Sequence, residues 1–230
     1  MTPRKETYTG RQVDFTDPDP ATICIEDIAH SLARTCRYGG HCRTEGIWSV
    51  AEHSLVVEHW LDEHFSIYRL RLLGLLHDAA EAYIGDLPPM AKELLPEYQR
   101  WEANCERAIW KAFDIDPPGM GEWPRVKEGD KAALAAEAAA FMFSQGADWP
   151  CNTATGNLPY IEPDKYTCRA VEDAFICRFR ILMRACCLTL PKTETPSERE
   201  DALDLAEIQR RMADGEDTIP LEELKADLGL

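Results

Sequence analysis

The strongest chemical signal lies in residues 72–92, where a hydrophobic run leads into His77 and Asp78, followed by Glu81 and by Asp86 in a Gly-Asp-Leu-Pro turn. If this segment is helical, His77 and Glu81 are related as i and i+4, and Asp78 and Glu81 as i and i+3. The three side chains can then line one side of a cavity. Neighbouring helical residues are only about 100° apart, so that His77 and Asp78 can also ligate the same ion.

A divalent ion usually takes four or more donors, and fewer of these come from the protein where waters stay bound. Two further donors lie in other segments: His53 in the string SVAEHS and Asp130 in the string VKEGDKAALAAE. The predicted set is therefore two imidazoles, His53 and His77, and two carboxylates, Asp78 and Asp130. This mixture suits one first-row ion such as Mn, Fe, Co, Ni or Zn better than Ca or Mg.

This order of ligands, with HDxxE and the trailing GDLP, resembles the HD-domain phosphohydrolases. Within that superfamily the chain is similar to the nucleotide-directed branch, which includes bacterial 5′-deoxynucleotidases and phage dATP triphosphohydrolases. The resemblance extends from about residue 21 to about residue 188. A lone histidine or aspartate in such segments would more often be structural, but three strings in order and register favour a site. They are SVAEHS, LLHDAAEAYIGDLP and VKEGDKAALAAE.

The resemblance implies an all-α HD-domain helical bundle and metal-dependent hydrolysis of a (deoxy)nucleotide, with a metal-activated water attacking phosphorus. In this hypothesis Glu81 orients the water or carries a proton, and Asp86 holds a sugar hydroxyl or completes the water network. Lys92, which follows the GDLP turn, matches a lysine that reaches a phosphate in triphosphate-cleaving relatives. The sequence leaves open whether a dNMP or a dNTP is the substrate, and which base is preferred.

A loop is predicted at residues 36–43, because two adjacent glycines permit unusual backbone angles and close approach to a ligand. The resemblance implies that an arginine followed by an aromatic residue contacts the nucleotide here. Arg37 fits as the phosphate ligand and Tyr38 as the stacking residue. His41 is a further candidate donor to a phosphate or base. Two other arginines compete for the role of Arg37: Arg34 and Arg43.

Hydrophobic periodicity predicts that the ligands lie on three different helices. His53 falls on the second helix predicted along the chain. The third helix carries the His-Asp pair and is apolar enough to be central and buried. Asp130 falls on an Ala-rich helix, which permits close packing. The predicted helices are 26–34, 48–64, 67–84, 97–113, 124–145 and 164–187, and residues 1–25 and 146–163 are expected to be irregular.

The composition changes near Leu188, and this divides the chain into an HD domain at residues 1–188 and an acidic C-terminal extension at 189–230. The extension has 12 acidic against 5 basic residues. Two short helices are predicted in it, Ser197–Ala213 and Leu221–Leu228. We expect this extension to pack on its own domain or on a neighbouring chain.

Composition also excludes several classes of partner. The net charge is −16 and no long basic run is present, which argues against duplex nucleic acid. Nine cysteines without a CxxC pattern favour reduced thiols and a cytoplasmic location over a disulfide framework. The first residues lack the apolar stretch of a signal peptide, and no run reaches the roughly 18 apolar residues of a membrane span.

The resemblance therefore implies an enzyme with a small nucleotide substrate, and it also implies a homo-oligomer. None of the six histidines follows His77, which argues against a second His-rich metal site of the di-iron oxygenase kind. The alternative is a non-catalytic HD-fold protein that regulates or binds a partner. The intact set of four ligands and Glu81 argues against that alternative.

Overall fold

A computed structural model of the chain describes residues 4–149, 158–162 and 164–188. The chain divides into two compact units, Met1–Cys186 and Cys187–Leu230. The predicted acidic extension at 189–230, with its two predicted helices, lies outside the described residues. The predicted loop at 146–163 is described only in part.

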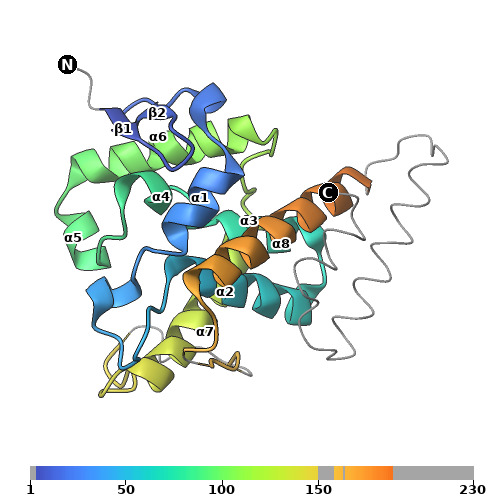
Figure 1. Cartoon of the computed structure of the whole chain (residues 1–230). Helices are drawn as coiled ribbons and strands as arrows, with labels where there is room; N and C mark the ends of the chain where they lie inside the picture. The colour runs from blue at the N-terminus through green and yellow to red at the C-terminus, as the bar shows by residue number, and fades with distance from the viewer. Residues whose placement is uncertain (1–3, 150–157, 163, 189–230) are drawn as a thin grey trace. The chain divides into compact units, whose positions relative to one another are not determined.

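The described part of the chain is mostly helical, as predicted (Figure 1). None of its helices has the length and apolarity that a bilayer crossing requires. Most predicted helix bounds lie within a few residues of those observed. The elements are β1 (Arg4–Glu6), β2 (Gln12–Asp14), a 3₁₀ helix (Pro20–Thr22), α1 (Ile25–Leu32), a second 3₁₀ helix (Arg37–Gly40), α2 (Val50–Phe65), α3 (Tyr68–Leu76), α4 (Glu81–Ile84), α5 (Pro89–Glu93), α6 (Pro96–Ala112), α7 (Trp123–Phe141) and α8 (Cys168–Leu188).

The N-terminal segment contains a β-hairpin, so the prediction of an irregular start was wrong there. Strands β1 and β2 pair antiparallel, with Lys5 opposite Val13. Val13 is fully buried while Gln12 is exposed, which is the alternation expected of a strand with one face on a core. The hairpin is short, and only one of its side chains is fully buried, which is why hydrophobic periodicity did not reveal it.

Helix α2 begins at a capping box that the sequence SVAE encodes. The Ser49 side chain accepts the Glu52 backbone N–H at 3.2 Å, and the Glu52 carboxylate accepts the Ser49 backbone N–H at 2.8 Å. The helix ends at Ser66, which adopts a left-handed conformation. The cap places His53 just after the first turn of α2, on its buried side.

The predicted helix 67–84 is broken in two, and this corrects the sequence analysis. Helix α3 ends at Leu76 and α4 begins at Glu81. Between them the backbone tightens into i to i−3 hydrogen bonds, from Ala79 N–H to the Leu76 carbonyl and from Glu81 N–H to the Asp78 carbonyl, each 3.0 Å. The His-Asp pair therefore lies in a tight turn after α3 rather than inside a continuous helix.

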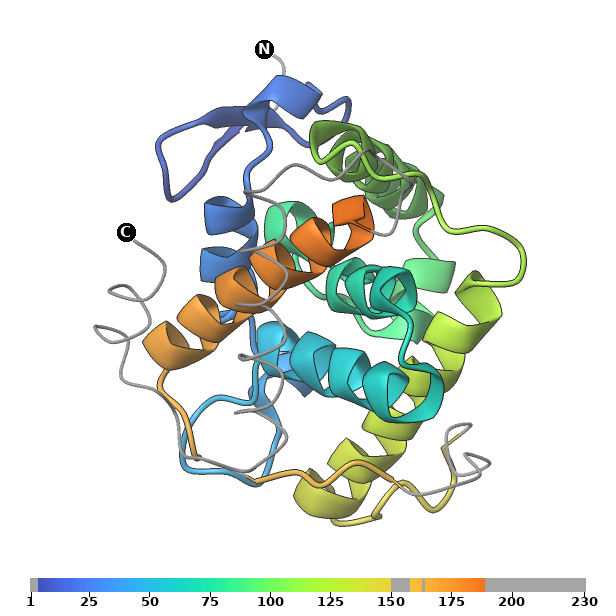
Figure 2. The same ribbon diagram turned by 90° about the vertical axis from the view of Figure 1, so that its right-hand side faces the viewer.

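Helices α3 and α7 both pack against α2 (Figure 2). Two glycines permit this close approach. A Cβ on Gly74 of α3 would overlap the Leu61 side chain of α2. A Cβ on Gly129 of α7 would lie 3.2 Å from Trp60 and 3.4 Å from Leu61. One glycine lies three residues before His77 and the other immediately before Asp130, so these crossings bring the ligand-bearing segments together.

Candidate metal centre

Two buried imidazoles face one another at the crossing of α2 with the end of α3. The side chains of His53 and His77 are both 0% exposed, and their ring centroids are 5.2 Å apart. His53 Nδ1 donates to Glu137 Oε1 at 2.6 Å, and His77 Nδ1 donates to the Gly74 carbonyl at 2.7 Å. With each Nδ1 occupied, each Nε2 is the nitrogen left for a ligand.

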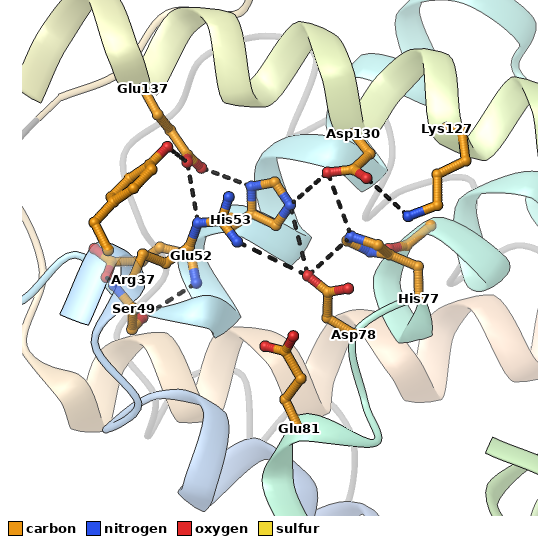
Figure 3. Close-up of polar contacts among 12 residues, drawn as sticks. Arg37, Ser49, Glu52, His53, His77, Asp78, Glu81, Lys127, Asp130 and Glu137 are labelled. Carbon is orange, nitrogen blue, oxygen red and sulfur yellow. Dashed lines mark hydrogen bonds and ion pairs between the residues drawn. The ribbon is translucent and has the colours of Figure 1, made fainter. Parts of the chain in front are cut away.

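Among the residues that the structure describes, neither Nε2 atom has a hydrogen-bond partner, although both are buried. An unpaired buried polar atom costs about 1–3 kcal/mol, so such atoms call for an explanation. Carboxylate oxygens approach both nitrogens instead. Asp130 Oδ1 lies 3.2 Å from His53 Nε2 and 3.8 Å from His77 Nε2, and Asp78 Oδ2 lies 3.1 Å from His77 Nε2 and 3.8 Å from His53 Nε2 (Figure 3).

These separations fit atoms that share one metal ion. Two ligand atoms that are each about 2.1 Å from a metal lie roughly 3–3.5 Å apart. The ligand atoms of His53, His77 and Asp130 lie within 4.8 Å of one another, and Asp78 faces the same two nitrogens. A His-His-Asp group that can hold a metal ion is thus present. Asp78, the fourth predicted ligand, faces the two histidine nitrogens but is not part of this group, so its role as a ligand stays a prediction.

The carboxylates are ionised where a cation would bind. Burial alone would raise the pKa of Asp78, but His77 and His53 hold it well below its ordinary value. Burial would also raise the pKa of Asp130, but both histidines and Lys127 lower it well below its ordinary value. Burial and Arg37 lower the pKa of His53, but Glu137 and Asp130 outweigh them and raise it to about 9. A proton and a divalent ion therefore compete for His53 Nε2 at neutral pH.

Glu137 supports the centre from α7, and the sequence analysis gave it no role. It is fully buried, and its second oxygen accepts hydrogen bonds from Arg37 Nε at 3.0 Å and the Tyr38 hydroxyl at 2.6 Å. Burial opposes its ionisation, but Arg37 and His53 lower its pKa to about 2. The sequence could have indicated this role, because Glu137 follows Asp130 by seven residues and both therefore lie on one side of a helix. A carboxylate behind a ligating histidine fixes the tautomer and orientation of the ring.

The predicted loop after α1 brings Arg37 and Tyr38 to this network. Tyr38 adopts a left-handed backbone conformation, with φ of 54°, and its hydroxyl points to Glu137. Arg37 is 12% exposed, and its Nη1 lies 3.9 Å from Asp78 Oδ2. The two rival arginines lie elsewhere: Arg34 pairs with Glu172, and Arg43 lies over the ring of Phe143.

Glu81 and Lys92 form an ion pair beside the ligands. Glu81 is buried at the start of α4; its Oε1 accepts from Lys92 Nζ at 3.0 Å, and its Oε2 has no hydrogen-bond partner. Lys92 also donates to Glu102 at 2.7 Å. Burial, Asp78 and Asp86 raise the pKa of Glu81 to about 8, although Lys92 opposes them. Asp86 is half-buried, and burial raises its pKa as well.

Comparison with known proteins gives a family but no activity. No family model matches the chain. It is 32% identical over 145 residues to uncharacterized protein YfdR of Escherichia coli, an alignment that covers 63% of this chain and 76% of YfdR. The chain belongs to the YfdR family. An uncharacterized protein of Rhodobacter capsulatus is 46% identical over 132 residues, which is 54% of this chain and 64% of that protein, just under two thirds of its length.

Of two further residues of this YfdR-family chain, His41 was predicted from the sequence to bind substrate and Lys127 was not. His41 is exposed, and no side-chain contact among the described residues joins it to the cluster, so its substrate role stays a prediction. Lys127, which the sequence analysis did not select, donates to Asp130 Oδ2 at 2.9 Å. It lies on α7 one turn before Asp130, and this spacing was its only signal.

Proposed function

We propose that this chain is a metal-dependent phosphohydrolase with an HD-type helical bundle, acting on (deoxy)nucleotides as a 5′-nucleotidase on a dNMP or a triphosphohydrolase on a dNTP. The observation that carries the proposal is the pair of buried, unpartnered Nε2 atoms of His53 and His77, with Asp78 and Asp130 facing them. The resemblance of the motifs to nucleotide-directed HD enzymes supports the choice of substrate class.

The four ligands suit one first-row divalent ion, namely Mn, Co, Fe, Ni or Zn, since two nitrogens and two oxygens form the donor set. Such an ion, when bound, lowers the pKa of a water and offsets the charge that develops on a phosphoryl group. Glu137 keeps the Nε2 of His53 turned to the ion by holding its Nδ1 proton. The Gly74 carbonyl does the same for His77.

The remaining residues move protons and bind the substrate. Glu81, with a pKa of about 8, exchanges a proton near neutral pH: the ionised form pairs with Lys92, and the protonated form can give its proton to the departing oxygen of the nucleotide. Asp86 accepts a sugar hydroxyl. Arg37 places positive charge beside Asp78, where phosphate oxygens would gather. Lys92 holds Glu81 in place and reaches a phosphate only by leaving Glu81 or Glu102.

The experiment is phosphate release from a panel of dNMPs and dNTPs, using protein stripped with a chelator and reloaded with Mn²⁺ or Co²⁺. Chromatography of the products separates phosphate from triphosphate release. We expect Asp78→Ala to lose bound metal and to fall to background turnover, while Glu63→Ala, which removes an exposed carboxylate from α2, keeps both.

Full activity of Asp78→Ala would refute the ligand assignment. A wild-type protein that binds metal but hydrolyses no nucleotide would favour the non-catalytic alternative, an HD-fold regulator or partner-binding protein. The cytoplasmic location and the homo-oligomer stay predictions from the sequence.

A further inference from the structure

Along α7, buried side chains enclose the candidate metal centre on the side of Glu137, whereas the side of Lys127 is exposed to solvent. Trp123, Lys127, Asp130 and Glu137 recur at i, i+4, i+7 and i+14, so they share one side of this helix. At the Glu137 end the space is filled, since Glu137 is fully buried and bonded to His53, Arg37 and Tyr38. At the other end, the Lys127 side chain is 42% exposed. A ligand at the metal can extend past Lys127 but not past Glu137.

A groove of about 810 Å³ lies beyond Lys127, between α6 and the loop that leads into α7. This volume is within the range of small-molecule sites, roughly 300–1,000 Å³. Its apolar lining includes Trp110, which is 6% exposed, Trp123, and Met120, which is 98% exposed. Arg100 and Arg107 add hydrogen-bond donors to the same lining.

Lys127 connects this groove to the centre. Its Nζ lies 5.2 Å from the centroid of the Trp123 ring and 2.9 Å from Asp130 Oδ2. Glu106 also lines the groove; burial and the neighbouring Glu102 raise its pKa, and Lys127 lowers it. The seven residues from Trp123 to Asp130 rise by about 10 Å along α7. A nucleotide whose phosphate is at the centre can reach Trp123 with its base.

Of the three cations around the centre, Lys127 is the most available for a ligand. Arg37 is 12% exposed and bonded to Glu137, and Lys92 is 23% exposed and held between two carboxylates. Lys127 has one carboxylate partner, Asp130, whose charge a metal would share.

We propose that the nucleoside part of the substrate lies in this groove, with its base against Trp123 and with Lys127 on a phosphate oxygen at the junction. The inference rests on the proposed function and adds the direction in which the substrate lies. Trp123 offers an aromatic surface to a base, and the arginines and Glu106 offer hydrogen bonds to its edge.

Equilibrium dialysis of deoxyadenosine against the Mn²⁺-loaded full chain tests the groove without requiring turnover. We expect Trp123→Ala to weaken binding at least tenfold, about 1.4 kcal/mol, and Trp123→Phe to restore most of it. The matched variant is Trp149→Ala, which removes an aromatic ring 5.8 Å from Tyr38 on the side of Glu137 and should change binding less than twofold. Unchanged binding in Trp123→Ala, or a larger loss in Trp149→Ala, would overturn the proposal.

Steady-state kinetics distinguishes a loss of nucleoside binding in the groove from a loss of phosphate binding at the candidate metal centre. With dAMP as substrate and inorganic phosphate as inhibitor, Trp123→Ala should raise KM at least tenfold and leave phosphate inhibition within twofold. Lys127→Met should weaken phosphate inhibition as well. A general defect in folding or metal binding would weaken both in Trp123→Ala, and that result would count against the groove. If the wild type hydrolyses no nucleotide, the proposed function fails, while the dialysis result still decides the groove.

Discussion

His53 and His30 each belong to a His-Glu-Arg triad, and only one of the two triads faces a metal centre. In the first, buried Glu137 binds His53 Nδ1 at 2.6 Å and Arg37 Nε at 3.0 Å. In the second, buried Glu172 binds His30 Nδ1 at 3.1 Å and Arg34 Nη1 at 2.7 Å. In each triad a carboxylate from a distant segment joins a histidine to an arginine.

The difference lies on the other side of each imidazole. His30 is 24% exposed, and its ring stacks on Tyr8 with centroids 3.6 Å apart. His53 is completely buried, and its Nε2 faces two carboxylates without a hydrogen bond. The triad around His30 is thus satisfied within the protein, whereas the triad around His53 orients a nitrogen toward a group of side chains that could hold a metal ion. A buried triad alone indicates packing, and an unpartnered ligand atom among converging carboxylates indicates a site.

The largest expected difference between the triads is in stability. Arg37→Ala in the metal-free protein leaves Glu137 buried with less compensating charge, and should lower the free energy of unfolding by about 3 kcal/mol. Arg34 is 38% exposed, so that solvent screens its loss, and Arg34→Ala should cost about 1 kcal/mol or less. Urea denaturation measures both. Equal losses in the two variants would contradict this prediction, because they would mean that the greater burial of Arg37 adds nothing to its contribution to stability.

Metal affinity gives the second contrast. Glu137→Gln removes the charge behind His53 and should weaken Mn²⁺ binding about 10- to 100-fold, the range for partners that orient a ligating histidine. Glu172→Gln makes the same change in the other triad and should leave Mn²⁺ binding unaltered. Titration calorimetry on chelator-treated protein compares the two variants. A similar loss in both would show that the effect is general and does not pass through His53.

The sequence could single out the candidate ligands because each lies in a short string with recognisable spacing. His53, His77, Asp78 and Asp130 fall in three strings whose register predicted a shared site. The helices that carry His53 and Asp130 formed close to the predicted bounds, whereas His77 and Asp78 follow the end of α3. The break between Leu76 and Glu81 was not predicted, because every residue in it is compatible with a helix. At this break His77 Nδ1 donates to the Gly74 carbonyl, and the backbone then forms a tight turn.

The supporting residues could not be assigned from the sequence, because their partners are far away along the chain. Glu137 is 84 residues from His53, and Glu172 is 142 residues from His30. Both histidines lie in predicted helices, and nothing local shows which carboxylate will reach which ring. The role of Gly74 was hidden for the same reason, since only the crossing with Leu61 of α2 reveals why a side chain is excluded there.

The smallest expected effect is the pH dependence of stability in the metal-free protein. The pKa of His53 is raised from 6.5 to about 9, against burial and Arg37, by Glu137 and Asp130. The native state thus holds a proton that the unfolded chain releases above pH 6.5, so this contribution is complete below pH 6.5 and is lost as pH rises to 9. We expect the free energy of unfolding to fall by more than about 1 kcal/mol over that window. His53→Gln should reduce this loss of stability with rising pH, and His30→Gln should not. Urea denaturation in the presence of a chelator, at about pH 6, 7.5 and 9, measures the free energy of unfolding of each variant. If His53→Gln still loses stability over this pH range, the proton belongs to another group.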